Sequence, residues 1–148
     1  MDLVFQNLTA DKKYNSKFFE NALDIAIKEL KLNNKELGLS INLVGEDKIK
    51  ELNNKYRGKN KITDVLSFPM TTKLITHNSK FLIHDLGDIF ICLPFAKKEA
   101  KSENVSIETK LAQLTVHGFL HLVGYDHEKS DKDEERMFHL ENQILKRL

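Results

Sequence analysis

The chain has 148 residues, of which 41% are hydrophobic and 30% are charged, and its formal net charge is +1. This size predicts one domain, residues 1–148, that can bury a core without disulfides. Because the net charge is close to zero, overall charge gives no evidence for nucleic-acid binding. The single cysteine, the lack of a signal-peptide pattern and the lack of an apolar stretch of about 18 residues predict a cytoplasmic protein without a membrane segment.

The pattern of apolar residues predicts strands and helices in alternation, followed by three helices. Apolar and polar residues that alternate indicate a strand, and apolar residues that recur every three to four positions indicate a helix. The predicted strands are residues 3–8, 39–45, 64–70 and 86–93. The predicted helices are residues 15–32, 46–56, 94–104, 106–124 and 131–147. This order predicts an α+β fold in which one small mixed sheet of about four strands packs with about five helices.

Three of the six histidines lie in the segment HGFLHLVGYDH, residues 117–127. His117 and His121 are four residues apart on a predicted helix, so their imidazoles lie on one face and can reach one metal ion. Gly124 can end the helix in a left-handed conformation, and the returning chain can then bring His127 toward the other two. Three nitrogen ligands leave the fourth position of a tetrahedral ion to water, as in catalytic zinc sites. The alternative is that these are hydrogen-bonded core histidines.

The histidine spacing is that of the metzincin motif H-E-x-x-H-x-x-G-x-x-H, with one departure. Gly118 stands where the motif has the glutamate that acts as general base in peptide hydrolysis. Because zinc lowers the pKa of bound water from about 15.7 to about 7, hydroxide can form near neutral pH without that base. The segment therefore predicts a zincin-type metal site that catalyses a reaction other than peptide hydrolysis, or a peptidase that has lost its activity.

Three segments of the chain resemble the YbeY family of bacterial endoribonucleases, which are also called ribosomal RNA maturation factors. Residues 117–127 resemble the signature H-G-x-L-H-L-x-G-Y-D-H. Residues 53–69, NNKYRGKNKITDVLSFP, resemble the block N-x-x-[YF]-R-x-K-x-x-T-[DN]-V-L-S-F-P, and residues 86–92, LGDIFIC, resemble the family's L-G-D-I strand. The segments follow the family's order and cover about a quarter of the chain.

The resemblance implies a zincin-like α+β fold, one Zn²⁺ ion per chain held by His117, His121 and His127, and hydrolysis of single-stranded RNA. It further implies a part in maturation of the 16S ribosomal RNA 3′ end and in ribosome quality control, with the small ribosomal subunit as a partner. Arg57 falls on the family's functional arginine, and His117 falls on the histidine treated as both ligand and catalytic residue.

The segment RGKNK, residues 57–61, brings three cations close together in the sequence. Arg57 could stabilise the negative charge that develops on an attacked phosphodiester. Lys59 and Lys61 could contact phosphates and make binding dependent on salt. The alternative is that all three are exposed residues of a turn.

Three further residues lie in the segments that resemble the family. Ser67 and Asp88 could line the substrate groove, or they could support the strands. Asp126 could orient a ligand imidazole or help to position water, or it could be an ordinary turn aspartate.

Two other functions and two other metals remain open at this point. A metal-dependent peptidase would keep the histidine cage but has no glutamate at the motif's position. A non-enzymatic assembly factor of the small ribosomal subunit would use zinc for structure alone. Three imidazoles also suit nickel or iron.

Overall fold

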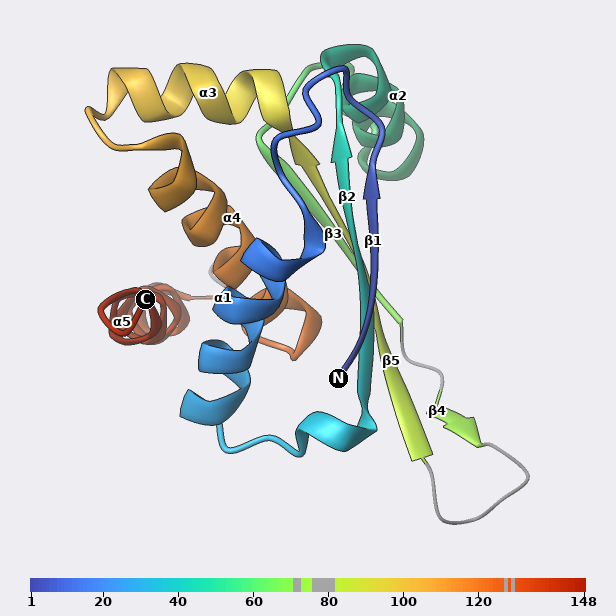
Figure 1. The fold of residues 1–148 in the computed structure, drawn as a ribbon, viewed down its shortest axis with the longest axis vertical. Coiled ribbons are helices and arrows are strands. Elements are labelled where there is room, and N and C mark those ends of the chain that lie inside the picture. The colour runs from blue at the N-terminus through green and yellow to red at the C-terminus, as the bar shows by residue number, and fades with distance from the viewer. Residues whose placement is uncertain (71–72, 76–81, 127, 129) are drawn as a thin grey trace.

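A computed structural model describes residues 1–70, 73–75, 82–126, 128 and 130–148 of the chain (Figure 1). Its strands are β1 (Asp2–Asn7), β2 (Leu37–Val44), β3 (Val65–Pro69), β4 (Lys73–Ile75) and β5 (Leu82–Cys92). Its helices are α1 (Ser16–Glu29), α2 (Glu46–Arg57), α3 (Leu93–Ser102), α4 (Ile107–Leu122) and α5 (Asp131–Leu145), with a short 3₁₀ turn at Asn34–Glu36. Every predicted strand and helix is present, whereas β4 and the first four residues of β5 were not predicted.

The strands form one mixed sheet in the order β1-β2-β5-β3, and β4 pairs with the outer part of β5. The pairs β1–β2 and β2–β5 are parallel, while β3 and β4 run antiparallel to β5. Ile89 of β5 lies opposite Ile41 of β2 on one side and opposite Ser67 of β3 on the other. The predicted α+β fold with a mixed sheet and five helices is confirmed. The order also places β3 at an edge of the sheet.

Helices cover the two faces of the sheet unequally (Figure 1). On one face, α1 and α4 pack on the inward side chains of β1, β2 and β5, and α5 packs on α4 from the far side. On the other face, α2 covers a smaller buried cluster, made of Val44, Ile49, Leu52, Leu66 and Cys92. Cys92 is fully buried, in agreement with its place in an apolar strand. None of the described helices is long and apolar enough to cross a membrane.

Helix α4 is the most deeply buried helix, and it carries the histidine pair. Ser106 caps its N-terminus, since its side-chain oxygen accepts a hydrogen bond from the backbone N–H of Thr109 at 3.1 Å. Leu111, Phe119 and Leu120 are fully buried, and each contributes about 1.5–3 kcal/mol by leaving water. The helix is thus a rigid support for side chains at its C-terminal end.

Candidate active site

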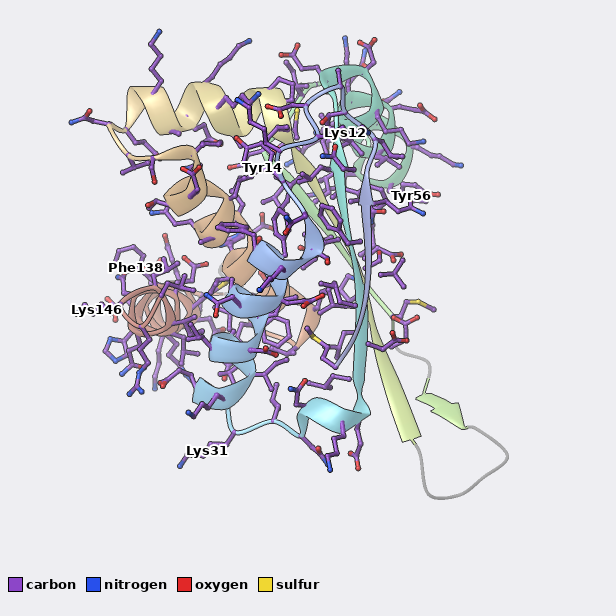
Figure 2. The ribbon with its side chains drawn as sticks, viewed as in Figure 1. Lys12, Tyr14, Lys31, Tyr56, Phe138 and Lys146 are labelled. Atoms are coloured by element: carbon purple, nitrogen blue, oxygen red, sulfur yellow. The ribbon has the colours of Figure 1, made fainter. Side chains whose placement is uncertain are left out.

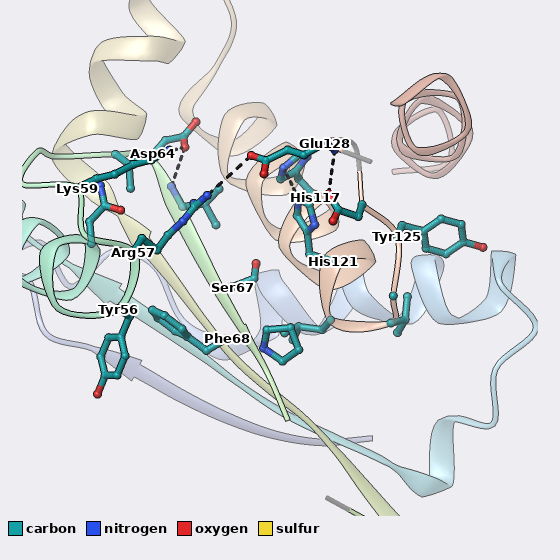
Figure 3. Close-up of a pocket in the computed structure, with 18 of the residues that line it drawn as sticks. Tyr56, Arg57, Lys59, Asp64, Ser67, Phe68, His117, His121, Tyr125 and Glu128 are labelled. Carbon is teal, nitrogen blue, oxygen red and sulfur yellow. Dashed lines mark hydrogen bonds and ion pairs between the residues drawn. The ribbon is translucent and has the colours of Figure 1, made fainter. Parts of the chain in front are cut away.

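A cleft of about 1000 Å³ opens where three parts of the chain meet: the end of α2 with its following turn, the edge strand β3, and the end of α4 with the loop after it (Figure 3). Most of the residues singled out in the sequence line this cleft, namely Arg57, Lys59, Lys61, Ser67, His117, His121 and Asp126. Segments that are about sixty residues apart in the sequence therefore face one another across it.

His117 and His121 project into the cleft from the last turns of α4. Their Nε2 atoms are 3.1 Å apart and their ring planes cross at 78°. Two ligands on one tetrahedral zinc ion, with bonds of about 2.0–2.1 Å, lie about 3.3–3.4 Å apart. Both Nε2 atoms can therefore bind one ion with little movement, and a nitrogen donor set of this kind suits zinc.

The third predicted ligand, His127, lies outside the described residues. Within the part of the chain that the structure describes, no group of three His, Cys, Asp or Glu side chains is arranged to hold a metal ion. The three-histidine cage therefore stays a prediction, supported by the fit of the His117 and His121 pair to one ion.

The outer nitrogen of His117 is bound by a residue that the sequence analysis did not single out. Nδ1 of His117 forms a hydrogen bond with Oε1 of Glu141, which reaches it from α5. A carboxylate in this position fixes the orientation and tautomer of a metal-binding imidazole and makes it a stronger ligand. The signal for Glu141 was present in the sequence, because it lies between Met137 and Ile144 on the buried face of α5. An acidic residue on an apolar helix face needs a partner.

Asp126, the carboxylate that the sequence analysis proposed for this role, is engaged elsewhere. Its Oδ1 accepts a hydrogen bond from the backbone N–H of Glu128 at 2.9 Å, which holds the turn after α4. Its proposed action on a ligand imidazole stays a prediction, because the neighbouring His127 is not described.

Arg57 is the last residue of α2. The turn that follows it is fixed by Gly58 and Asn53, and it places the cations of residues 57–61 along the cleft. Gly58 ends the helix with φ +67°, a left-handed conformation that favours glycine. The buried amide of Asn53 donates to the backbone oxygen of Lys61 at 2.9 Å and ties the turn to the helix. Lys59 and Lys61 both line the cleft.

Across the cleft, Arg57 pairs with Glu128 in the loop after α4 (Figure 3). Nη2 of Arg57 lies 3.8 Å from Oε1 of Glu128, and both side chains are exposed. Ion pairs of this kind contribute about 0.2–1 kcal/mol. The pair is therefore weak enough for a bound anion to replace Glu128 as the partner of Arg57.

The close approach of α4 to the sheet explains the glycine at position 118. A Cβ on Gly118 would lie 3.0 Å from Cγ2 of Ile89 and 3.2 Å from Oγ of Ser67. Oγ of Ser67 also donates to the backbone oxygen of Gly118 at 3.4 Å. Position 118 thus faces the sheet, and a glutamate there would point into β3 and β5 rather than into the cleft.

Asp88 is not brought together with the other candidates. It is adjacent to Ile89 on β5, so its side chain points to the opposite face of the sheet. It accepts a hydrogen bond from the hydroxyl of Ser40, and Nδ2 of Asn42 donates to the same hydroxyl oxygen at 3.0 Å. Among the described residues Asp88 does not line the cleft, and its proposed role in substrate binding stays a prediction.

Comparison with known proteins identifies the family. The model of the family described as endoribonuclease YbeY matches residues 4–148. The chain is 39% identical to the endoribonuclease YbeY of Persephonella marina over 93% of this chain and 86% of that protein. It is 43% identical to that of Staphylococcus saprophyticus over 74% of this chain and 71% of that protein.

A solved structure agrees with these sequence comparisons. The solution structure of TM1509 from Thermotoga maritima is 32% identical in sequence and superimposes with a TM-score of 0.61, over 96% of this chain and 87% of that one. The resemblance noted in three short segments of the sequence thus extends over nearly the whole chain. This protein belongs to the YbeY endoribonuclease family.

Proposed function

We propose that this chain is a metal-dependent endoribonuclease that hydrolyses single-stranded RNA in the cleft beside α4. The observation that carries the proposal is the His117 and His121 pair, with Nδ1 of His117 held by Glu141, in the same cleft as Arg57. Family membership supplies the reaction class, because the relatives are named endoribonucleases.

In this proposal His117, His121 and His127 hold one Zn²⁺ ion. When bound, the ion supplies Lewis acidity and an activated water. Glu141 accepts the Nδ1–H of His117, which leaves the Nε2 lone pair of that ring directed into the cleft. The bond to Glu141 therefore orients His117 beside His121, so that both Nε2 atoms can face one ion.

The cations of the turn after α2 act on the phosphate. As water attacks the phosphorus and the bond to the leaving ribose oxygen breaks, negative charge grows on the phosphate oxygens. The planar fork of Arg57 exchanges Glu128 for those oxygens and stabilises the charge. Lys59 and Lys61 bind the neighbouring phosphates of the strand and hold it along the cleft.

We propose, on the family resemblance, that the substrate in the cell is the 3′ end of 16S ribosomal RNA on the small subunit. The enzyme would then act in the cytoplasm, in rRNA maturation and in ribosome quality control. A peptidase activity is disfavoured because the position that carries the peptidase base is Gly118, which packs against Ile89 and Ser67 of the sheet.

The test is cleavage of a labelled RNA in single-stranded and duplex form, with metal content measured on the same preparations. Wild type should cut the single strand and carry one zinc per chain, and His117→Ala should lose both. His139→Ala, an exposed histidine of α5, is the matched control and should behave as wild type. Arg57→Ala should keep its metal and lose about 100-fold in kcat, with partial recovery in Arg57→Lys. Highly purified His117→Ala that cuts as fast as wild type would refute the proposal.

A further inference from the structure

We propose that Tyr56 is the stacking platform for a nucleobase of the single-stranded RNA bound in the cleft. The inference rests on the proposed function, since it assumes that RNA binds there. The inference assigns a base-binding subsite to Tyr56, a residue that takes no part in the proposed reaction at the metal.

Tyr56 is a large aromatic residue that stays 58% exposed while it lines the cleft. It lies in the last turn of α2, next to Arg57, with its ring beside Phe68 and its hydroxyl pointing away from His117 and His121 (Figures 2 and 3). Its exposed surface is therefore available to a ligand in the cleft. A single-stranded nucleic acid is such a ligand, because unpaired bases stack on exposed aromatic side chains.

The ring of Tyr56 is held in place by other aromatic rings. It meets Phe68 of β3 at a centroid distance of 5.2 Å and an angle of 62°. Phe68 in turn meets Phe90 of β5 at 5.7 Å and 74°. Both phenylalanines pack on the buried cluster beneath α2. Tyr56 is therefore the outer member of an anchored aromatic row, and it can accept a base without a large loss of conformational entropy.

The edge strand β3 relates this row to the histidine pair. Adjacent residues of a strand point to opposite faces, so Ser67 faces α4 and Gly118, whereas Phe68 faces Tyr56. The cleft thus extends over both sides of β3. A strand whose reacting phosphate lies between His117 and Arg57 crosses this edge, and its neighbouring nucleotide can reach Tyr56.

The charges around Tyr56 suit the same ligand. Arg57, Lys59 and Lys61 line the cleft together with Asp64, Asp126 and Glu128, and Nζ of Lys55 lies 5.2 Å from the centre of the Tyr56 ring. Cations beside an exposed aromatic ring are the usual elements of single-strand binding. A duplex keeps its bases paired and stacked inside, so it cannot use the platform. Tyr56 would then contribute to the preference for single strands.

The first experiment uses the fact that the chain contains no tryptophan. Tyr56→Trp introduces a single fluorescent indole at the proposed platform. Addition of a short single-stranded RNA should quench its emission, and the same sequence as a duplex should not. The matched control is Phe138→Trp on α5, because Phe138 is 64% exposed and lies on the opposite side of the molecule (Figure 2). Its emission should stay unchanged.

The second experiment measures affinity by fluorescence anisotropy, with the strand checked for intactness after each reading. Tyr56→Ala should bind the single strand on the order of 10-fold more weakly, whereas Tyr56→Phe and Phe138→Ala should bind it as wild type does. All four proteins should bind an abasic phosphodiester strand of the same length equally, because that strand has no bases to stack. The slope of affinity against salt should also be unchanged in Tyr56→Ala, since no phosphate contact is lost.

Three results would overturn the inference: Tyr56→Ala that binds RNA within twofold of wild type, an equal loss for the abasic strand, or equal quenching of Trp at position 138. The proposed function fails separately. Wild type that binds RNA but never cuts it, together with quenching in Tyr56→Trp, would contradict the endoribonuclease and leave the platform in place. Wild type that cuts, with a fully active and tightly binding Tyr56→Ala, would contradict the platform alone. Absence of any RNA binding would refute both.

Discussion

The hydrogen bond between His117 and Glu141 decides which nitrogen of His117 is available to the cleft. An ionised carboxylate can only accept hydrogen bonds, so in the tautomer that this contact favours a neutral His117 carries its proton on Nδ1 and has its lone pair on Nε2. The side chain of Glu141 comes from a different helix, and the packing of α5 on α4 therefore sets the chemistry of the ring.

Replacement of Glu141 by glutamine should weaken metal binding and leave the fold intact. Glutamine keeps the size of the side chain and removes the charge that strengthens the imidazole as a ligand. We expect Glu141→Gln to bind zinc about 10–100-fold more weakly, measured by competition with a coloured chelator. Glu135→Gln, an exposed glutamate on the same helix, should retain wild-type affinity. Equal zinc affinity in Glu141→Gln and wild type would show that Glu141 does not strengthen metal binding.

At the scale of residues, the sequence predicted the contacts that depend only on spacing within one helix. His117 and His121 share a helix face, so four positions of separation were enough to bring their Nε2 atoms within 3.1 Å. Glu141 is twenty-four positions beyond His117, and no periodicity of one helix specifies which partner another helix meets. The orientation of Gly118 toward Ile89 likewise depends on how α4 sits on the sheet.

At the scale of elements, the position of the edge strand β3 depends on one glycine of β5. Gly87 has φ +118°, and a Cβ there would lie 2.0 Å from the backbone oxygen of Phe68 and 2.9 Å from the backbone nitrogen of Met70. Gly87 pairs with Pro69 at the end of β3. A side chain at position 87 would therefore force apart the two strands that support the cleft.

Gly87→Ala should lower the free energy of unfolding by about 3 kcal/mol or more, because backbone strain and a backbone clash add together. Urea denaturation followed by circular dichroism measures this. Gly45→Ala is the control, since Gly45 has φ −87° and no atom lies within 4 Å of an added Cβ. It should cost no more than about 1 kcal/mol, the usual cost of alanine at a helix N-cap. Equal costs for the two variants would contradict the account of Gly87.

Elements with one buried face were predicted from their spacing. Strand β1 alternates exposed and half-buried residues, and helix α1 buries Phe19, Leu23, Ala26 and Ile27 on one side. Residues 71–85 mix short apolar runs, at 74–75 and 81–83, with polar residues and show no alternation. For that reason β4 and the start of β5 were not predicted. The strand order β1-β2-β5-β3 is a long-range property that no local pattern encodes.

At the scale of the whole molecule, α4 is tied to its neighbours by polar contacts near both ends. Near its C-terminal end the contact is that of His117 with Glu141 on α5. In its first turn, Lys110 has a side chain only 7% exposed and pairs with Glu103 at 2.8 Å and with Glu99 of α3 at 3.5 Å. Burial first, and then the neighbouring Asp64 carboxyl group, raise the pKa of Glu99 from 4.5 to about 7, against the lowering effect of Lys110.

The raised pKa of Glu99 should make stability fall as pH rises. Between about pH 4.5 and pH 7 the folded chain holds a proton on Glu99 that the unfolded chain has released. The free energy of unfolding therefore decreases with pH over this window. Glu99→Gln is uncharged at every pH, and its amide can donate to Asp64 in place of the carboxyl proton. The loss of stability between pH 5 and pH 8 should be smaller in the variant than in wild type, by on the order of 1 kcal/mol.

Urea denaturation at pH 5 and pH 8 measures this difference. Glu20→Gln, at an exposed position of α1, should keep the wild-type difference between the two pH values. At pH 8 Glu99→Gln should also be the more stable protein, because it has no second carboxylate beside Asp64. At pH 5, where Glu99 is already protonated, the two proteins should be nearly equal. A pH dependence in Glu99→Gln as steep as that of wild type would show that other groups cause it, and Glu99 would then carry its charge in the folded chain.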